Sequence, residues 1–517
     1  MSKIPNIVYV LFDDMGYGDV SCLNPEGKIP TPNFDRCANQ GMTFTNAHST
    51  SSVCSPSRYG ILTGRYNWRS KLQQYIVDFY GDPLIDKDRL TVPKLLKQNG
   101  YHTACIGKWH LGMGWDFDTT DDFLPQGGIA PGFANGFTEA TERQKTVWKN
   151  AFSKPITGGP IAAGFDYYFG VDVPNWPPYC FIENDRTVGI PSEWLQPRLL
   201  GDNLAGQQGP AMPYWNFEQL LPTFASKADS YIKERTQNNE TFFLYLPMTS
   251  PHTPLSVNKK WIGKSGLNNL YADLVMESDD IFGQILDSLD RYGVADNTLV
   301  ILTSDNGCAH YIGADQLEAQ GHYPSGKFRG YKSDAWDGGH HIPFFARWPG
   351  VIREGSKCDE LLSQADLMAT CASIIDETLS GNAGEDSVSM MSLFKETGSS
   401  THDYLVHHSI LGKFAICDKQ WKLVLCPGSG GWSKDDAQAY QEGLPLVQLY
   451  DLMSDPGEKR NLCNDHPDIV KSMIRQLEKF VDAGRSTDGG MQPNDTSVDI
   501  WKLYLIPGAG QTILDDY

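Results

Sequence analysis

The carboxyl ends of two apolar runs of strand length carry oxygen-bearing side chains. The runs are residues 7–12 and 298–303; two such residues follow the first run directly, and two follow the second run after Ser304. The four residues are Asp13, Asp14, Asp305 and Asn306. Ligands of open α/β sheets bind outside the carboxyl ends of the strands, and donors that are all oxygen suit a hard cation. The set predicts a site for Ca²⁺, with Mg²⁺ as second choice, although either pair alone is typical of a turn.

A second candidate for chemistry is the run of residues 52–65, which reads Ser-Val-Cys-Ser-Pro-Ser-Arg-Tyr-Gly-Ile-Leu-Thr-Gly-Arg. It holds Cys54, a proline two residues on and Arg58 four residues on. One interpretation is an ordinary helix start, with Ser55 as the N-cap and Pro56 in the first turn. A helix start also directs backbone N–H groups and the positive end of the helix dipole at an anion. A lone cysteine, by contrast, is more often a small buried apolar residue.

The same run resembles the C-x-P-x-R signature of the type I, formylglycine-dependent sulfatases of the alkaline phosphatase superfamily. Three further segments resemble other blocks of that family in the same order, and residues 449–458 resemble a C-terminal segment of bacterial carbohydrate sulfatases. The three segments are 107–112, 250–254 and 328–343, with Lys108, His110, His252 and Lys332. The resemblance covers residues 6 to about 462. One departure is His341, which stands where the family commonly has an arginine.

The resemblance implies that Cys54 is oxidised by a formylglycine-generating maturation enzyme. The hydrated aldehyde then attacks the sulfur atom of a sulfate ester in line. A divalent cation binds both the modified residue and the sulfate oxygens, which neutralises charge on the sulfuryl group. The implied metal ligands are Asp13, Asp14, Cys54, Asp305 and Asn306.

The remaining matched positions take the other roles of the family. Arg58 is expected to hold the formylglycine side chain and support the metal carboxylates. Lys108 and Lys332 are expected to bind the sulfate oxygens. His252 is expected to protonate the leaving alcohol. His110 is expected to accept the proton of the remaining hydroxyl, so that sulfate is expelled as the aldehyde re-forms.

Composition restricts the partners of this chain. The net charge of −20 over 517 residues disfavours nucleic acid. No run approaches the ~18 apolar residues that a membrane-spanning helix needs. The eleven cysteines include no C-x-x-C pair, which disfavours a zinc ribbon. The first residues carry no signal-peptide pattern, whereas the resemblance implies an exported enzyme, periplasmic or secreted.

The elements that must position these residues alternate between strand-like and helix-like runs. They are predicted at 7–12, 31–40, 56–64, 91–99, 102–106, 224–236, 241–246, 266–291 and 298–303. This alternation predicts an α/β fold with a large, mainly parallel sheet sandwiched by helices, and the resemblance implies an alkaline-phosphatase-like arrangement. Residues 115–220, rich in glycine, proline and tryptophan, are expected to form long loops over the carboxyl edge of the sheet.

A domain boundary is expected near residue 400. It divides a catalytic sulfatase domain, 1–400, from a C-terminal subdomain, 401–517. Beyond the boundary we predict strands at 404–409, 414–417 and 421–425 and a helix at 468–483. These elements predict a small α+β subdomain, with antiparallel strands and one helix packed on them.

The substrate is predicted from the region between the Lys108 and His252 segments, which holds five tryptophans. Aromatic rings stack on sugar rings, although core packing is the usual role of any one tryptophan. The region also resembles, less specifically, bacterial sulfatases that act on 6-O-sulfated galactose or N-acetylgalactosamine. We therefore expect an exo-acting sulfatase of a sulfated carbohydrate. Asp172, Trp176 and His341 are the expected contacts to the sugar.

Two other functions remain open. One is a phosphonate or phosphate monoester hydrolase of the same superfamily, which can share the C-x-P-x-R block. The oxygen ligand set together with Lys332 favours sulfate, and a two-zinc phosphatase would need further histidine ligands. The other is a catalytically silent carbohydrate-binding protein on the same scaffold. Intact residues in every catalytic segment disfavour that second alternative.

Overall fold

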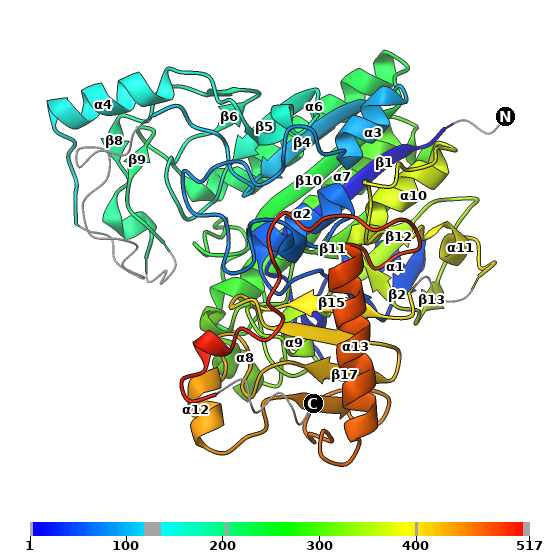
Figure 1. Cartoon of the computed structure of the whole chain (residues 1–517). Coiled ribbons are helices and arrows are strands. Elements are labelled where there is room, and N and C mark those ends of the chain that lie inside the picture. Colours follow the sequence, from blue (N-terminus) through cyan, green and yellow to red (C-terminus); the bar gives the residue numbers. More distant parts are fainter. Residues whose placement is uncertain (1–3, 118–135, 202–205, 399–401, 510–517) are drawn as a thin grey trace.

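A ten-stranded sheet forms the centre of the computed structural model, which describes residues 4–117, 136–201, 206–398 and 402–509 (Figure 1). The strand order is β13-β2-β12-β11-β1-β10-β4-β5-β6-β7. The strands are β1 (Asn6–Asp13), β2 (Met42–Phe44), β4 (His102–Lys108), β5 (Tyr167–Val171), β6 (Ile182–Glu183), β7 (Arg186–Thr187), β10 (Phe242–Pro251), β11 (Thr298–Ser304), β12 (Phe344–Arg347) and β13 (Ser356–Cys358).

The five central strands β11, β1, β10, β4 and β5 run parallel. Every residue of β1 is buried, because side chains on both faces of the sheet are covered. Phe12 of β1 pairs with Ser304 of β11, so the two strands end at the same level. The polar segments that follow these strands therefore leave the sheet side by side, as the sequence predicted.

Helices cover both faces of the sheet. Ile7, Tyr9 and Leu11 of β1 face one apolar core, and Val8 and Val10 face the other. The first core includes residues of α2 (Cys54–Thr63), α3 (Val92–Gln98) and α10 (Leu367–Ile374). The second includes residues of α1 (Pro32–Asn39), α6 (Leu220–Gln237) and α7 (Leu270–Arg291). The predicted α/β fold with a mainly parallel sheet is confirmed.

A separate antiparallel sheet follows in the C-terminal part. Its strands are β15 (Leu405–His408), β16 (Phe414–Cys417), β17 (Trp421–Val424) and β18 (Gln448–Asp451). Helix α13 (Pro467–Ala483) packs Met473 and Leu477 against Phe414 and Leu423 of this sheet (Figure 1). The prediction of antiparallel strands with one helix packed on them is therefore confirmed. The predicted boundary lies at 399–401, outside the described residues, so the division into two domains stays a prediction.

The expectation of long loops over residues 115–220 is wrong for the described part of that region. It contains α4 (Glu142–Phe152) and strand β5, which extends the main sheet beside β4. The start of α4 carries a recognisable signal, since Thr141 and Gln144 form a capping box. Glycine, proline and tryptophan dominate the composition and hide these short elements. Residues 118–135 and 202–205 of the region lie outside the described residues.

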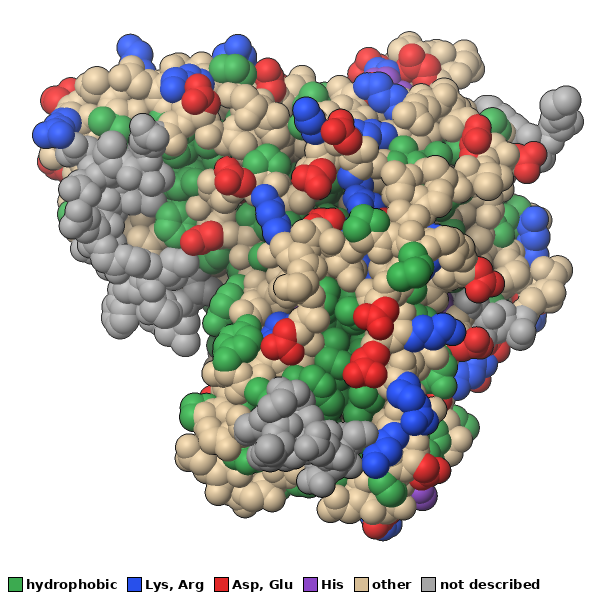
Figure 2. Space-filling model, in the orientation of Figure 1, with side chains coloured by type: hydrophobic (Ala, Val, Ile, Leu, Met, Phe, Trp, Pro, Cys, Tyr) green, Lys and Arg blue, Asp and Glu red, His purple; other side chains and the backbone are tan. Residues whose placement is uncertain are grey.

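Short elements complete the described chain. They are β3 (Ala47–His48), β8 (Glu193–Trp194), β9 (Pro210–Ala211), β14 (Leu362–Ser363), α5 (Gly159–Ala162), α8 (Ala314–Ala319), α9 (Asp337–His340), α11 (Met391–Phe394) and α12 (Asp436–Gln441). Within the described ranges, no helix combines the length and the apolarity needed to cross a membrane. Acidic and basic side chains are interspersed on the face drawn in Figure 2.

Candidate active site

The residues predicted to do chemistry gather at the carboxyl ends of neighbouring parallel strands. In sheet order, the strands are β11, β1, β10 and β4. The residues at or just past their ends are Asp305 and Asn306, Asp13 and Asp14, His252, and Lys108 and His110. Residues 240 or more positions apart in the sequence thus meet because parallel strands end at one edge of the sheet.

Cys54 is the first residue of α2, so the amino end of this helix is part of the site. Its Sγ and one carboxylate oxygen from each of Asp13 and Asp305 all lie within 4.8 Å of one another. Burial raises the pKa of the Cys54 thiol, so the unmodified residue is not a thiolate nucleophile. Ser55 lies inside the helix and Val53 is the N-cap residue, so the suggestion of Ser55 as cap is wrong.

Arg58 ties this helix to the ends of the strands. Its guanidinium is fully buried and donates to Asp305 Oδ2 from Nε (3.1 Å) and from Nη2 (2.8 Å). Nη1 donates to the backbone oxygen of Lys108 (3.2 Å). Two charged N–H groups on one carboxylate oxygen hold that oxygen in place. Arg58 therefore sets the position of Asp305 relative to Cys54.

The buried oxygens of this site fit a cation. Asp13 Oδ1 and Asn306 Oδ1 are buried and accept no hydrogen bond, whereas Asn306 Nδ2 donates to Asp14 Oδ1 (2.8 Å). Burial and the charge of Asp13 raise the pKa of Asp305, so this carboxyl needs a positive neighbour to stay ionised. Asp14 has a left-handed backbone (φ 66°), which is uncommon outside glycine. All these donors are oxygens, as a hard cation requires.

Two buried lysines supply positive charge on either side of the adjacent aspartates. Lys108 Nζ lies 2.7 Å from Asp13 Oδ2, and Lys332 Nζ lies 2.7 Å from Asp14 Oδ1. Burial acts to raise the pKa of Asp13, but the positive charges around it, Lys108 first, together outweigh burial and hold that pKa well below its usual range. Burial likewise acts to lower the pKa of Lys332, but Asp14 and other neighbours together raise it above the usual value, so Lys332 is charged at neutral pH.

The two histidines of the site have different free nitrogens. His252 donates from Nδ1 to the Thr253 oxygen (2.6 Å), which leaves Nε2 facing Asp14 Oδ2 at 3.7 Å. His110 donates from Nε2 to the Val77 oxygen (3.0 Å), and its buried Nδ1 makes no hydrogen bond. Burial, aided by Lys332, lowers the pKa of His252 to about 4. Burial also lowers the pKa of His110, so both rings are neutral in the free protein.

Comparison with known proteins identifies the family of this chain. The family model described as Sulfatase matches residues 5–376. The chain belongs to the sulfatase family. It is 31% identical to an N-acetylgalactosamine-6-O-sulfatase of Bacteroides thetaiotaomicron, over 92% of this chain and 93% of that protein. It is therefore a hydrolase of sulfuric esters, which removes the catalytically silent alternative.

Solved structures agree with this assignment of the sulfatase. One Bacteroides thetaiotaomicron structure, from work on the metabolism of multiple glycosaminoglycans, aligns with a TM-score of 0.77 and 30% identity over 92% of this chain and 99% of that one. A phosphonate monoester hydrolase of Agrobacterium radiobacter aligns with a TM-score of 0.56 and 17% identity, over 92% of this chain and 95% of that one. The second likeness shows a shared fold only.

The three residues expected to contact sugar lie in different settings in this sulfatase. Asp172 follows β5, and its Oδ1 accepts from the backbone N–H of His110 (3.2 Å). Trp176 packs edge-on against the His110 ring, with centroids 5.7 Å apart. His341, by contrast, uses both ring nitrogens within the protein, with Asp337 Oδ2 at 3.2 Å and the Thr45 oxygen at 2.9 Å. Asp172 and Trp176 therefore adjoin His110, one of the predicted catalytic residues, whereas both ring nitrogens of His341 have partners within the protein.

Sequence reasoning missed a network beneath the metal-ligand candidates. The Tyr271 hydroxyl of α7 lies 3.0 Å from the Asp14 backbone oxygen and also contacts the Asp19 carboxylate. His322 Nε2 lies 2.9 Å from the other Asp19 oxygen. The only sequence signal was Asp19 itself, five residues after the adjacent aspartates. Its partners lie about 250 and 300 positions away, so local pattern could not find them.

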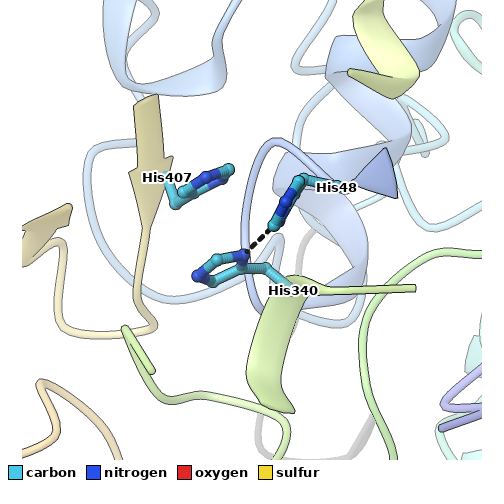
Figure 3. Close-up of side chains that lie close together, drawn as sticks. All are labelled: His48, His340 and His407. Atoms are coloured by element: carbon cyan, nitrogen blue, oxygen red, sulfur yellow. Dashed lines mark hydrogen bonds between the residues drawn. The ribbon is translucent and has the colours of Figure 1, made fainter. Parts of the chain in front are cut away.

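A second buried group of potential metal ligands lies between the main sheet and the C-terminal sheet. This histidine cluster consists of His48, His340 and His407, and each offers a nitrogen within 4.8 Å of the others (Figure 3). His48 Nδ1 and His340 Nδ1 are 3.1 Å apart, and the rings of His340 and His407 are stacked at 3.8 Å. Lys422 Nζ lies 3.1 Å from His340 Nε2. No motif or spacing in the sequence groups these three residues.

Proposed function

We propose that this sulfatase removes 6-O-sulfate from a terminal galactose or N-acetylgalactosamine of a sulfated glycan. The observation that carries the proposal is the likeness to the N-acetylgalactosamine-6-O-sulfatase, which spans nearly the whole of both chains. The assembled Cys54 site supports the same chemistry. The substrate is thus inferred from the relative, and the reaction from the relative and the site together.

Two groups that the family uses fit the residues of this site. Cys54, once oxidised, supplies the hydrated aldehyde whose hydroxyl attacks sulfur. Asp13, Asp14, Asp305 and Asn306 would hold the divalent cation together with the modified Cys54, and the cation supplies positive charge against the sulfate oxygens. We propose Ca²⁺ over Mg²⁺, because four protein oxygens and added substrate oxygens suit its larger coordination number.

The fixed positive side chains hold the sulfate group in this proposal. Lys108 is paired with Asp13 and Lys332 with Asp14, and both lysines are buried. They would bind the sulfate oxygens and stabilise charge that shifts onto them during transfer. Arg58, fixed by Asp305, would keep the side chain of residue 54 directed at sulfur. None of these groups has to move, so the site is pre-organised.

The histidines divide the proton transfers. His252 has its free Nε2 on the side of Asp14, where it would protonate the leaving alcohol oxygen. An anionic sulfate ester beside it raises its pKa from the low value of the free protein, so the proton is taken up with the substrate. His110 has an unpaired, unprotonated Nδ1, which suits a base for the remaining hydroxyl of residue 54. Each ring thus presents the nitrogen that its role requires.

The sugar would lie against Asp172 and Trp176. Burial raises the pKa of Asp172 to about 6, and its second oxygen remains available to a sugar hydroxyl. Trp176 is 8% exposed. We propose an exo-acting enzyme that takes a terminal sulfated sugar, as expected from the resemblance of this region to carbohydrate sulfatases.

The test is a panel of sulfated monosaccharides at equal concentration. It compares 6-O-, 4-O-, 3-O- and 2-O-sulfated galactose, galactosamine and glucosamine, with sulfate release as the readout. The proposal expects 6-O-sulfated galacto sugars to be turned over fastest. Preference for a simple aryl sulfate over all of these, or for internal sulfates of a long polymer, would contradict it.

A further inference from the structure

An exposed tryptophan of the C-terminal part stands beside the catalytic lysine segment. Trp432 lies in the loop 427–435 between β17 and α12, and it is 53% exposed. A single exposed apolar side chain is ordinary by itself, so the position of Trp432 next to the Lys332 segment is what points to a role. Figure 1 places α12, which follows this loop, close to α8, which follows Tyr311.

The loop is held against the residues that follow Lys332. Trp432 N–H donates to Ser333 Oγ (3.0 Å), and Ser433 N–H donates to Asp334 Oδ1 (3.2 Å). The Ala335 N–H donates back to the oxygen of Ser429 in the loop (2.7 Å). These bonds fix the loop along the chain that carries the sulfate-binding lysine.

Close packing and internal bonds make the same loop rigid. A Cβ on Gly431 would lie 2.4 Å from the Ser333 backbone oxygen, so only glycine permits this approach. Gly428 and Gly430 both donate their N–H groups to Asp436 Oδ1 at 3.1 Å. The backbone that carries Trp432 therefore has a fixed position, which lowers the entropy cost of binding against this loop.

Tyr311 connects Trp432 to the reaction centre. The two rings have centroids 6.0 Å apart and are tilted by 43°. The Lys332 N–H donates to the oxygen of Cys308, so the segment that carries Tyr311 runs beside the catalytic lysine. Tyr311 thus lies in the segment next to Lys332, and Trp432 continues its aromatic surface outward to solvent.

We infer that Trp432 is the platform for the second sugar ring of the substrate, the ring linked to the sulfated terminal sugar. This inference rests on the proposed function, because it assumes that the sulfate is carried by a glycan. An indole face stacks on the apolar face of a pyranose, and a rigid, half-exposed indole offers such a face. The terminal sugar would lie on the inner side, near Asp172 and Trp176. The C-terminal part of the chain thereby contributes to substrate selection.

The experiment measures how strongly the enzyme prefers a disaccharide over a monosaccharide. Both substrates carry the same 6-O-sulfated terminal sugar, and kcat/KM is measured for wild type, Trp432→Ala and Trp432→Phe. The ratio of the two kcat/KM values cancels any loss of active protein. A small aryl sulfate reports on the sulfatase reaction itself, because it has no second ring.

We expect wild type to prefer the disaccharide and Trp432→Ala to lower that ratio about tenfold, the loss of one aromatic stacking contact. Trp432→Phe keeps an aromatic face and should restore most of the ratio, and neither variant should change kcat/KM for the aryl sulfate. An unchanged ratio in Trp432→Ala would overturn the second-ring platform and leave the sugar sulfatase proposal standing. Wild type that hydrolyses only the aryl sulfate would overturn both.

Discussion

The two buried groups of potential metal ligands in this protein differ in what their atoms still lack. At the catalytic site, Asp13 Oδ1 and Asn306 Oδ1 are buried oxygens without a hydrogen bond. In the histidine cluster, the His48 and His340 nitrogens have partners inside the protein. His48 Nε2 lies 2.9 Å from Asn46 Oδ1, and His340 Nε2 lies 3.1 Å from Lys422 Nζ. Nearness of ligand-type side chains is common to both groups. Unmet hydrogen-bonding capacity belongs to the first group.

Ring orientation separates the two groups further. A metal binds an imidazole in the plane of the ring, along the nitrogen lone pair. The rings of His340 and His407 are stacked with 12° between their planes, so both cannot direct a lone pair at one ion (Figure 3). Lys422 adds a positive charge, paired with Asp337 at 2.7 Å and Glu458 at 2.8 Å. The histidine cluster is therefore a poor fit for a metal ion, and the oxygens of the Cys54 site remain the proposed cation ligands.

The largest expected effect is on catalysis and comes from residue 54. Cys54→Ala removes the nucleophile precursor and should lower kcat by at least about 10⁴-fold, since removing a catalytic nucleophile has effects of that size. Mass spectrometry of the tryptic peptide that ends at Arg58 should show the aldehyde in active wild-type enzyme. Active enzyme with only an unmodified thiol would refute the proposed mechanism.

The cation tests the comparison directly. Asp13→Asn keeps the size of the side chain but removes charge from the proposed ligand set. We expect stoichiometric calcium to be lost and activity to fall at least about 10²-fold, the scale of losing a charge-stabilising group. His407→Gln, the matched change in the histidine cluster, should leave metal content as in wild type. Elemental analysis of both variants measures this, and metal lost from His407→Gln instead would reverse the assignment of the two groups.

Sequence pattern was sufficient for the parts of this molecule that local chemistry specifies. The apolar runs before Asp13 and Asp305 form β1 and β11, because strands covered on both faces must be apolar throughout. The Cys54 segment also predicted a helix, and α2 forms there. Strand β5 was missed because it is only five residues long and lies in a region rich in glycine and proline. The histidine cluster and Trp432 were beyond reach, because tertiary packing alone joins them to their partners.

The next largest effect is on stability and comes from Lys422, beside the histidine cluster. Lys422→Met leaves the buried carboxylates of Asp337 and Glu458 without their shared cation. Breaking a buried ion pair by removing one partner costs about 3–5 kcal/mol of unfolding free energy. Lys434→Met, which breaks the exposed pair with Glu442, should cost less than about 1 kcal/mol. Urea unfolding measures the loss of unfolding free energy in both variants, and equal losses would contradict a difference between the buried and the exposed ion pairs.

Acid should lower the unfolding free energy of the protein through the buried histidine cluster. Burial lowers the pKa of His407 to about 3 in the folded protein, against an ordinary value near 6.5. The unfolded chain therefore takes up a proton first, and stability is lost as pH falls from about 6.5 towards 3. At pH 5 the loss from His407 is about 2 kcal/mol relative to pH 8. The difference in unfolding free energy between pH 8 and pH 5 should be about 2 kcal/mol smaller in His407→Gln than in wild type. His310→Gln, which removes an exposed imidazole, is the control, and an equal change in slope in both variants would contradict the burial argument.

The smallest expected effect concerns the support of the cation site. Tyr271 lies 3.0 Å from the Asp14 oxygen and helps to hold the left-handed backbone that turns this aspartate into the site. Tyr271→Phe removes a buried hydroxyl that contacts both the Asp14 oxygen and the Asp19 carboxylate, and it should weaken calcium binding about fivefold by calorimetric titration, which corresponds to about 1 kcal/mol. The control is Tyr231→Phe, which removes a hydroxyl that contacts the backbone oxygen and the ring of His102 at the opposite end of the sheet. Both variants keep the aromatic ring, so the position of the lost hydroxyl distinguishes them. Calcium affinity that changes equally in both would mean that Tyr271 supports the fold in general, not Asp14 in particular.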